Sequence, residues 1–315
     1  MTPSLFVNII CFKDPDVVNT VCDLFNKAYD PKRITVGVVL QEDEQELYRY
    51  KLLERIPNVK LIVHPTSWAE GSGKARFEGI KLYEGENYYF QTDAHMRFDQ
   101  DWEEMLIKEL KQCKAQRPII TTLPPGFDPS TGKKETPAYN KLILKNFFRH
   151  IPIHVGKRTE ISKYEAADSP QRTPFLAGGV IFATGGICGI KPDPYFYYLG
   201  EEITFNLRLW TRGFANFLPR FNFCYHEYRH RNFNRVTFRD YLLSVDPSKE
   251  SFLHERSMSR YQVLMNLKHK DEVPVEHLID FERYDFGAAR TVRDWEDAYG
   301  IWIREEKVNP EVYSG

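Results

Sequence analysis

Short apolar runs alternate with amphipathic segments over the first part of the chain. The runs at 5–12, 34–40, 59–63 and 87–92 are rich in Val, Ile, Leu and Phe and predict buried strands. Between them, apolar residues recur at helical spacing from Val17 onwards, and 43–55 and 74–83 also fit helices. This alternation predicts an α/β fold with a mostly parallel, doubly wound sheet.

The pattern changes after residue 98. We expect a helix ending near Cys113 and a helix at 201–212 closed by Gly213. Strands are predicted at 118–122, within 142–155 as one strand or two, and at 175–184, whereas 124–139 and 164–174 have loop composition. Beyond His226 the chain is charged and helical. The sequence thus predicts a main domain over 1–230 and a mostly helical extension over 231–315, packed on it.

Composition narrows the class of protein. The 315 residues are 42% hydrophobic, enough for a large core, and the net charge of −1 provides no global field toward nucleic acid or membrane. The odd number of cysteines, five, and the lack of a Cys-x-x-Cys pair predict reduced thiols in a cytoplasmic protein. No apolar run reaches the ~18–20 residues of a membrane span. Because a strand begins near residue 5, we also expect no signal peptide and no Golgi-type anchor.

Candidate metal ligands follow two of the predicted strands. Asp93 and His95 come directly after the strand at 87–92, and His226 follows the apolar run 221–225. One carboxylate and two imidazoles can hold a divalent ion with positions left open for oxygen ligands. The alternatives are a solvated turn for Asp93 and His95 and a structural role for His226. A buried strand leading into these groups favours pairing or metal binding.

Basic residues suggest an anion near this site. Four arginines follow His226, and they either grip a diphosphate or form a solvated basic face: Arg229, Arg231, Arg235 and Arg239. Arg76, one turn into its helix, is either a surface charge or the partner of a carboxylate or phosphate.

A glycine pair and a glutamate pair mark further candidates. Gly178 and Gly179 lie inside the predicted strand 175–184, where glycine weakens a strand, so they indicate close approach of a ligand or backbone, or a bulge. Glu201 and Glu202 open a helix. One of them complements the helix N-terminus, and the other can accept hydrogen bonds from sugar hydroxyls or orient an acceptor.

The segment Phe-Gln-Thr-Asp-Ala-His-Met-Arg-Phe at 90–98, followed by Trp102, resembles the signature of the cytosolic polypeptide N-acetylglucosaminyltransferases. The type member of that family modifies hydroxyproline on the Skp1 ubiquitin-ligase subunit. The resemblance extends over roughly the whole chain, through the segments 7–14, 74–76, 200–203, 208–213, 225–231 and 284–294.

The resemblance implies a GT-A glycosyltransferase fold over 1–230, a UDP-sugar donor such as UDP-GlcNAc, and retention of configuration at the sugar. Asp93, His95 and His226 would hold Mn²⁺ or Mg²⁺ between the donor's phosphates. Glu201 or Glu202 would lie near the reacting carbon or the acceptor hydroxyl, and no protein nucleophile is assigned. The residues expected to contact the donor are Ile10, Cys11, Phe12, Asp14, Arg76, Gly178, Gly179 and Arg231.

The acceptor implied by the resemblance is a protein hydroxyl, on hydroxyproline or Ser/Thr. The alternative acceptor for the same reaction is a glycan hydroxyl or a hydroxylated DNA base. The net charge of the chain does not indicate nucleic-acid binding. A non-catalytic nucleotide or glycan binder on the same fold, and a metal-dependent phosphohydrolase, are the competing classes. A phosphohydrolase usually needs more carboxylates around the ion than the sequence offers.

Overall fold

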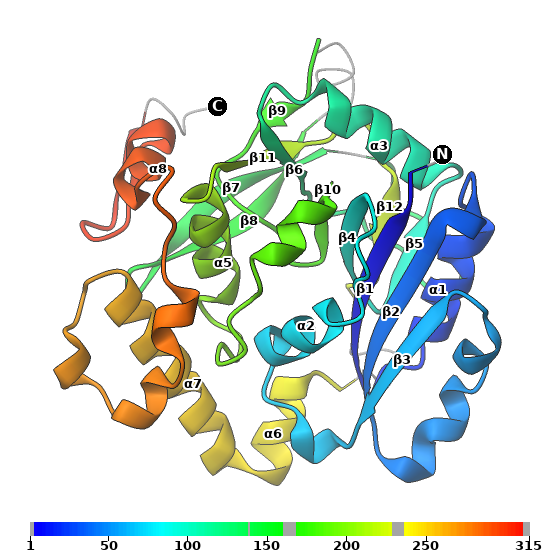
Figure 1. Cartoon of the computed structure of the whole chain (residues 1–315), viewed down its shortest axis with the longest axis horizontal. Coiled ribbons are helices and arrows are strands. Elements are labelled where there is room, and N and C mark those ends of the chain that lie inside the picture. Colours follow the sequence, from blue (N-terminus) through cyan, green and yellow to red (C-terminus); the bar gives the residue numbers. More distant parts are fainter. Residues whose placement is uncertain (1–2, 138, 160–167, 229–235, 311–315) are drawn as a thin grey trace.

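The computed structural model describes residues 3–137, 139–159, 168–228 and 236–310 (Figure 1). Within this part of the chain, the largest sheet has eight strands in the order β3-β2-β1-β4-β10-β6-β11-β9. All but β10 and β9 run in one direction. The mixed but mostly parallel α/β class predicted from the sequence is confirmed. The strands are β1 Leu5–Phe12, β2 Ile34–Gln41, β3 Val59–His64, β4 Tyr88–Asp93, β6 Arg117–Ile120, β9 Gln171–Arg172, β10 Val180–Thr184 and β11 Phe214–Leu218.

Successive side chains of β1 point to opposite faces of this sheet and are buried on both. Leu5, Val7 and Ile9 pack with apolar residues of helices α1 (Val17–Asn26) and α3 (Trp102–Gln112). Phe6 points to the other face, where it joins a cluster with residues of α2 (Ser72–Ile80) and α5 (Glu201–Trp210). Because successive strand residues face opposite sides, one apolar strand supports helices on both.

In the described part of the chain three antiparallel strand pairs lie outside the large sheet, one of them in the C-terminal part. Strand β12 (Cys224–His226) pairs with β5 (Met96–Phe98), and β7 (Tyr139–Phe148) forms a hairpin with β8 (Ile151–Thr159). The segment 142–155 therefore contributes to two strands, one of the two outcomes predicted for it.

The C-terminal part is mostly helical and ends in a short hairpin (Figure 1). Residues of this part, among them Tyr261 and Trp295, share one hydrophobic cluster with Leu142 and Leu207 from before residue 230. Among the described helices, none combines the length and the apolar character needed to cross a bilayer. The elements are α6 Phe238–Val245, α7 Pro247–Leu264, α8 Val292–Tyr299, β13 Ile301–Trp302 and β14 Lys307–Val308.

Short 3-10 helices connect these elements, and one region of them corrects a prediction. The segment 43–55 is not an α-helix; it forms η2 (Glu44–Tyr50) and η3 (Leu53–Arg55). Within it only Tyr50 and Leu53 are fully buried, so the segment lacks the continuous apolar stripe that holds an amphipathic α-helix on a core. The others are η1 Pro31–Arg33, η4 Thr66–Trp68, η5 Gly185–Gly189, η7 Lys270–Glu272, η8 Val275–Leu278 and η9 Phe281–Tyr284.

The predicted strand at 175–184 is also shorter than expected, because β10 begins only at Val180. The Val180 amide donates to the Ala177 carbonyl at 3.0 Å, so Gly178 and Gly179 occupy the centre of a tight turn before the strand. The turn reverses the chain at the edge of β4 where Asp93 lies.

Candidate metal and nucleotide site

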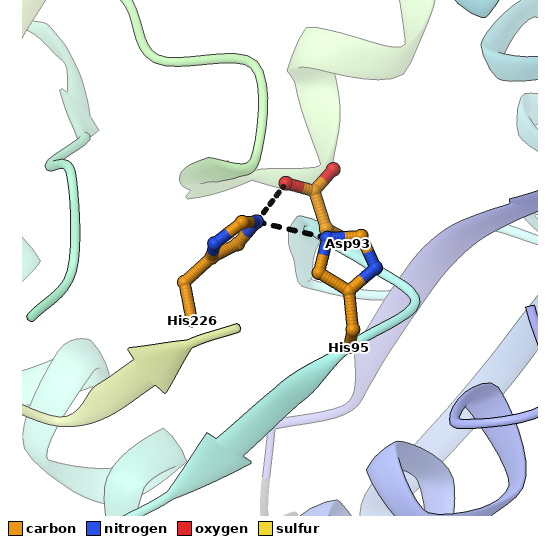
Figure 2. A group of neighbouring side chains, drawn as sticks. All are labelled: Asp93, His95 and His226. Carbon is orange, nitrogen blue, oxygen red and sulfur yellow. Dashed lines mark hydrogen bonds and ion pairs between the residues drawn. The ribbon is translucent and has the colours of Figure 1, made fainter. Parts of the chain in front are cut away.

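Three predicted metal ligands meet at the carboxyl edge of β4. Asp93 is the last residue of β4, and His95 lies in the turn between β4 and β5. His226 ends β12, and its register opposite Met96 brings it beside His95 although 130 residues separate them in sequence. Figure 2 shows the three side chains pointing toward one another.

The separations of the donor atoms fit one shared ion. His226 Nε2 lies 2.9 Å from His95 Nε2 and 3.3 Å from Asp93 Oδ2. The three ligand atoms lie within 4.8 Å of one another. With metal–ligand bonds of about 2.1 Å, neighbouring ligands at right angles are about 3 Å apart. The donor set, one carboxylate and two imidazoles, therefore suits a divalent cation with further positions for phosphate oxygens.

Asp14 sets the orientation of His95. Its Oδ2 lies 2.9 Å from His95 Nδ1, while its Oδ1 accepts a hydrogen bond from the Asp16 amide at 3.0 Å. A carboxylate at Nδ1 holds the proton there and leaves the lone pair of Nε2 facing His226. From the sequence we expected Asp14 to contact the nucleotide, and its contact with His95 was not predicted. The signal was available in the neighbouring positions of β1 and β4.

The Asp93 carboxylate is held in its charged form. Burial favours the neutral acid, but the hydrogen bond from His226 and the charges of His226, His95 and Arg76 outweigh it. The pKa of Asp93 therefore lies well below its usual value. A charged carboxylate beside two imidazoles is the state that a cation requires.

The Arg76 guanidinium pairs with Glu201 beneath the metal ligands. Arg76 Nη1 lies 2.5 Å from Glu201 Oε2, and both side chains are buried. Burial disfavours the charged guanidinium, but the carboxylates of Glu201, Asp93 and Glu202 raise the pKa of Arg76 above its usual value. The sequence left two interpretations of Arg76 open. A surface charge is wrong, because the side chain is buried, and pairing with a carboxylate is observed.

The two glutamates of α5 have different environments. Glu201 is 4% exposed and engaged by Arg76 and, at 3.4 Å, by the Ser72 hydroxyl. The Glu202 side chain is 42% exposed; its Oε1 accepts from the Gly178 amide at 2.7 Å, and its Oε2 lies 3.8 Å from His154 Nε2. Glu202 is therefore the glutamate with access to a ligand.

The glycine pair accommodates side chains of the site. A Cβ at Gly178 would lie 2.6 Å from an Arg76 nitrogen and 2.7 Å from Glu202 Oε1, and one at Gly179 would lie 2.3 Å from Asp93 Oδ2. The close approach inferred from the sequence is present, but protein side chains make it at a turn, and neither a backbone nor a bulge is involved.

The end of β1 offers backbone groups next to Asp93. Among the described strands, β1 pairs with β4 as far as Ile10 and with β2 as far as Phe12. On the β4 side, the ladder thus stops before Cys11 and Phe12. The Phe12 ring packs edge-on against aromatic residues of α6, Phe238 at 4.9 Å and Tyr241 at 5.3 Å.

The predicted basic cluster lies largely outside the described residues, which exclude Arg229, Arg231 and Arg235. The fourth arginine, Arg239, is in α6 and pairs with Glu250 at 3.3 Å, so its described contact is a surface ion pair.

Two neighbours of the site were not predicted. His154 stacks on Phe175 with ring centroids 4.9 Å apart, beside Glu202. The Tyr228 ring lies 4.2 Å from that of His226, and its hydroxyl donates to the Pro124 carbonyl at 2.8 Å. Tyr228 belongs to the segment that resembles the family motif, whereas nothing in the sequence around His154 distinguishes it from other hairpin residues.

A family model described as "Glycosyltransferase (GlcNAc)" matches residues 4–51 and 43–304. A search among curated proteins found no match. The crystal structure of GalNAc-T7 with UDP, GalNAc and Mn²⁺ is similar, with a TM-score of 0.59 and 15% identity over 94% of this chain. This chain spans 58% of the length of GalNAc-T7. At this identity the likeness is one of fold, and the fold agrees with the expected GT-A glycosyltransferase architecture.

Two structures of S. aureus TarS 1-349 match with TM-scores of 0.45. The first is 13% identical over 89% of this chain and 80% of TarS. The second, in complex with UDP-GlcNAc, is 11% identical over 89% of this chain and 81% of TarS.

Proposed function

We propose a reaction for a chain that belongs to the Glycosyltransferase (GlcNAc) family: transfer of GlcNAc from UDP-GlcNAc to a hydroxyl group. Family membership makes the protein a glycosyltransferase. The choice of UDP-GlcNAc rests on the family description, and the complexes of GalNAc-T7 with UDP and of TarS with UDP-GlcNAc motivate testing both N-acetylhexosamines.

The observation that carries the proposal is the convergence of Asp93, His95 and His226 within 4.8 Å. In our proposal these residues hold Mn²⁺ or Mg²⁺ beside the donor's diphosphate. When bound, such an ion offsets the negative charge that develops on the departing nucleotide diphosphate. Asp14 keeps His95 in the tautomer that can bind it.

The remaining residues position the donor and the acceptor. The backbone of Cys11 and Phe12, which lacks β4 pairing among the described strands, receives the nucleotide base, and Asp14 lies at the same strand end. Arg76, fixed by Glu201, lies beside the turn of Gly178 and Gly179, where its charge favours an anionic donor.

Glu202 is the carboxylate that we place beside the sugar or the acceptor hydroxyl. Among the described residues its ion-pair contact is the 3.8 Å approach to His154, whereas Glu201 is paired with the buried Arg76. We propose retention of configuration without a protein nucleophile, the donor's own diphosphate accepting the acceptor's proton on the same face. The proposed acceptor is a protein hydroxyl of the kind that the Skp1-modifying family uses, in a cytoplasmic setting.

The test is donor hydrolysis without an acceptor. The purified chain is incubated with UDP-GlcNAc, UDP-GalNAc, UDP-glucose and GDP-mannose, each with Mn²⁺ or with EDTA, and released nucleotide diphosphate is measured. We expect release from UDP-GlcNAc that depends on Mn²⁺. His226→Ala and Asp93→Asn should each lower it by about two orders of magnitude or more, since both remove a ligand of the ion.

The matched control is His254→Ala on α7, which removes an imidazole outside the site and should leave hydrolysis unchanged. Equal hydrolysis in Mn²⁺ and EDTA would refute metal dependence. Metal-dependent binding of UDP with no turnover of any donor, even with hydroxyproline peptides added, would favour the non-catalytic binder over the enzyme.

A further inference from the structure

A cavity of about 280 Å³, separate from the metal ligands, has a strongly cationic wall. Four of the residues that line it are basic and two are aromatic: Lys191, Arg208, Arg212, Arg283, Phe77 and Tyr284. They come from α2, the segment after η5, the end of α5, and η9. Arg208, Arg212 and Tyr284 lie in segments that carry the family resemblance, but the resemblance gave them no role, and the proposed reaction does not use this cavity.

The cavity lies at the opposite edge of the sheet from Asp93. Strand β10 runs antiparallel to β4, and the Gly185 amide that follows it donates to the Asn87 carbonyl at the start of β4. Asp93 is the last residue of β4, six residues beyond Asn87 and therefore roughly 20 Å away at ~3.3 Å per residue. Within α5, Arg208 is in the last turn whereas Glu201 is the first residue, about 10 Å apart along the axis.

Arg208 is buried without a carboxylate in contact. It is 3% exposed, and its Nη1 donates to the Lys191 carbonyl at 2.9 Å. Within the described part of the chain its Nε has no hydrogen-bond partner and its guanidinium makes no ion pair. The nearby carboxylate of Asp193 is taken by Arg260, at 2.9 and 2.6 Å. Burial lowers the pKa of Arg208 to about 10, and the Asp193 carboxylate opposes that shift only in part.

The other basic side chains add to this excess. Arg212 donates to the backbone carbonyls of Arg208 at 3.1 Å and Asp285 at 2.9 Å, and within the described ranges it makes no ion pair. Lys191 faces the Phe77 ring at 5.5 Å and makes no ion pair in the described residues. Arg283 is the exception, because its Nε lies 3.6 Å from Asp280.

The helix terminus explains part of this arrangement and leaves part unexplained. Cations at the C-terminus of a helix interact favourably with its carbonyl end, which accounts for Arg208 in the last turn of α5 and for Arg212 just beyond the C-cap Thr211. This helix-end interaction does not account for Lys191 and Arg283, which come from other elements and line the same cavity. Burying an unpaired charge is costly, and a bound anion removes that cost.

We propose that this cavity is a binding site for a phosphate dianion. The phosphate oxygens accept hydrogen bonds from Arg208 and Arg212 and pair with Lys191, because guanidinium groups match tetrahedral oxyanions and several cations are better neutralised by a dianion than by one carboxylate. The dianion is either inorganic phosphate or the phosphate of a small ester. For an ester, the organic part would lie against the rings of Phe77 and Tyr284.

The test is calorimetric titration of the full chain with inorganic phosphate and, separately, with glucose 6-phosphate, in a low-salt buffer with EDTA. We expect saturable binding at one site. Lys191→Gln should weaken it about 3-fold or more, and Arg208→Met, which removes a buried charged donor, about 10- to 100-fold. Tighter binding of the ester than of phosphate assigns the site to phosphate esters, and equal or weaker binding assigns it to inorganic phosphate.

The control is Lys108→Gln on α3, where the side chain is 72% exposed; it removes the same charge elsewhere and should not change binding. If Arg208→Met does not fold, the double variant Lys191→Gln/Arg283→Gln takes its place, with the same expected loss of at least 10-fold. The proposal is overturned if neither probe binds saturably, or if both bind the pocket variants as tightly as they bind the wild type.

Discussion

The contact between Asp14 and His95 gives a sharp prediction for Asp14→Asn. Asp14 uses both oxygens, one facing His95 Nδ1 at 2.9 Å and one accepting from the Asp16 amide at 3.0 Å. Asparagine has a single oxygen. If that oxygen stays with Asp16, the amide N–H faces His95 and moves the histidine proton to Nε2, the atom that faces His226. If it turns to His95, the Asp16 amide loses its acceptor.

The magnitude follows from the burial of this pair. The Asp14 and His95 side chains are 7% and 17% exposed, so a charge-assisted hydrogen bond of about 1.5–3 kcal/mol is lost or inverted. This corresponds to a loss of about 10- to 100-fold in metal affinity, the usual effect of removing a partner that orients a metal-binding histidine. We expect calorimetric titration with Mn²⁺, in the absence of nucleotide, to show that loss with the fold intact by circular dichroism.

The control is Asp16→Asn, which removes the same charge two residues away. Asp16 pairs with Arg97 at 2.7 Å and makes no contact with His95 in the described structure. Removing the Asp16 charge tests how far general electrostatic attraction contributes to cation binding. Because Asp16 is partly exposed, we expect Mn²⁺ affinity to fall less than about 3-fold. The orienting role of Asp14 would be refuted if the Mn²⁺ affinity of Asp14→Asn stayed within about 2-fold of the wild type. Equal losses of Mn²⁺ affinity in Asp14→Asn and Asp16→Asn would refute it as well.

Three further changes probe the site and the fold. Arg76→Met should lower the free energy of unfolding in urea by about 3 kcal/mol or more, because it leaves Glu201 buried without its partner, and adding Glu201→Gln should recover part of that loss. Gly179→Ala should reduce Mn²⁺ affinity at least about 10-fold, since a Cβ there would lie 2.3 Å from Asp93 Oδ2. Burial lowers the pKa of His277 below its usual 6.5, so the unfolded chain takes up this proton first; stability should fall as the pH drops through 6.5, and less so in His277→Gln.

Each of these has a comparison that can contradict it. Purely additive effects of the Arg76 and Glu201 substitutions would mean that the two side chains do not interact. Gly186→Ala places a Cβ where no atom lies within 4 Å and should leave Mn²⁺ binding unchanged; an equal loss there would point to a general backbone effect. Identical pH dependence of urea unfolding in His277→Gln and the wild type would remove His277 as a contributor.

The strands could be predicted from the sequence because burial on both faces leaves a local signature. β1, β2, β3 and β4 lie within two residues of their predicted bounds. β1 and β2 are the strands that are largely buried and apolar, whereas β3 is an edge strand that is only partly buried. The same logic failed at 175–184, where apolar residues continue through 175–177 but the chain turns at Gly178 and Gly179. The turn is fixed by side chains that arrive from α2, β4 and α5, and no local pattern encodes these contacts.

The metal ligands could be proposed from residue type and position, since Asp93 and His95 follow the carboxyl end of a parallel strand. His226 reaches them from β12, which pairs antiparallel with β5 outside the large sheet. The partner of each charged group in the site could not be predicted from the sequence. Glu201 and Glu202 are adjacent and identical in type, yet one is committed to Arg76 and the other faces the open side. Their roles separate only when α2 packs against the same sheet face as α5, which is a property of the tertiary fold.

The central claim is that Asp93, His95 and His226 hold an ion that receives a nucleotide diphosphate. It is tested most directly by titrating UDP into the full chain, with Mn²⁺ and with EDTA, for the wild type and for His226→Ala. Our account predicts binding that is at least about 10-fold tighter with Mn²⁺ than with EDTA in the wild type, and no such gain in His226→Ala. Equal affinity for UDP with and without Mn²⁺ in the wild type, or an undiminished gain in His226→Ala, would contradict it.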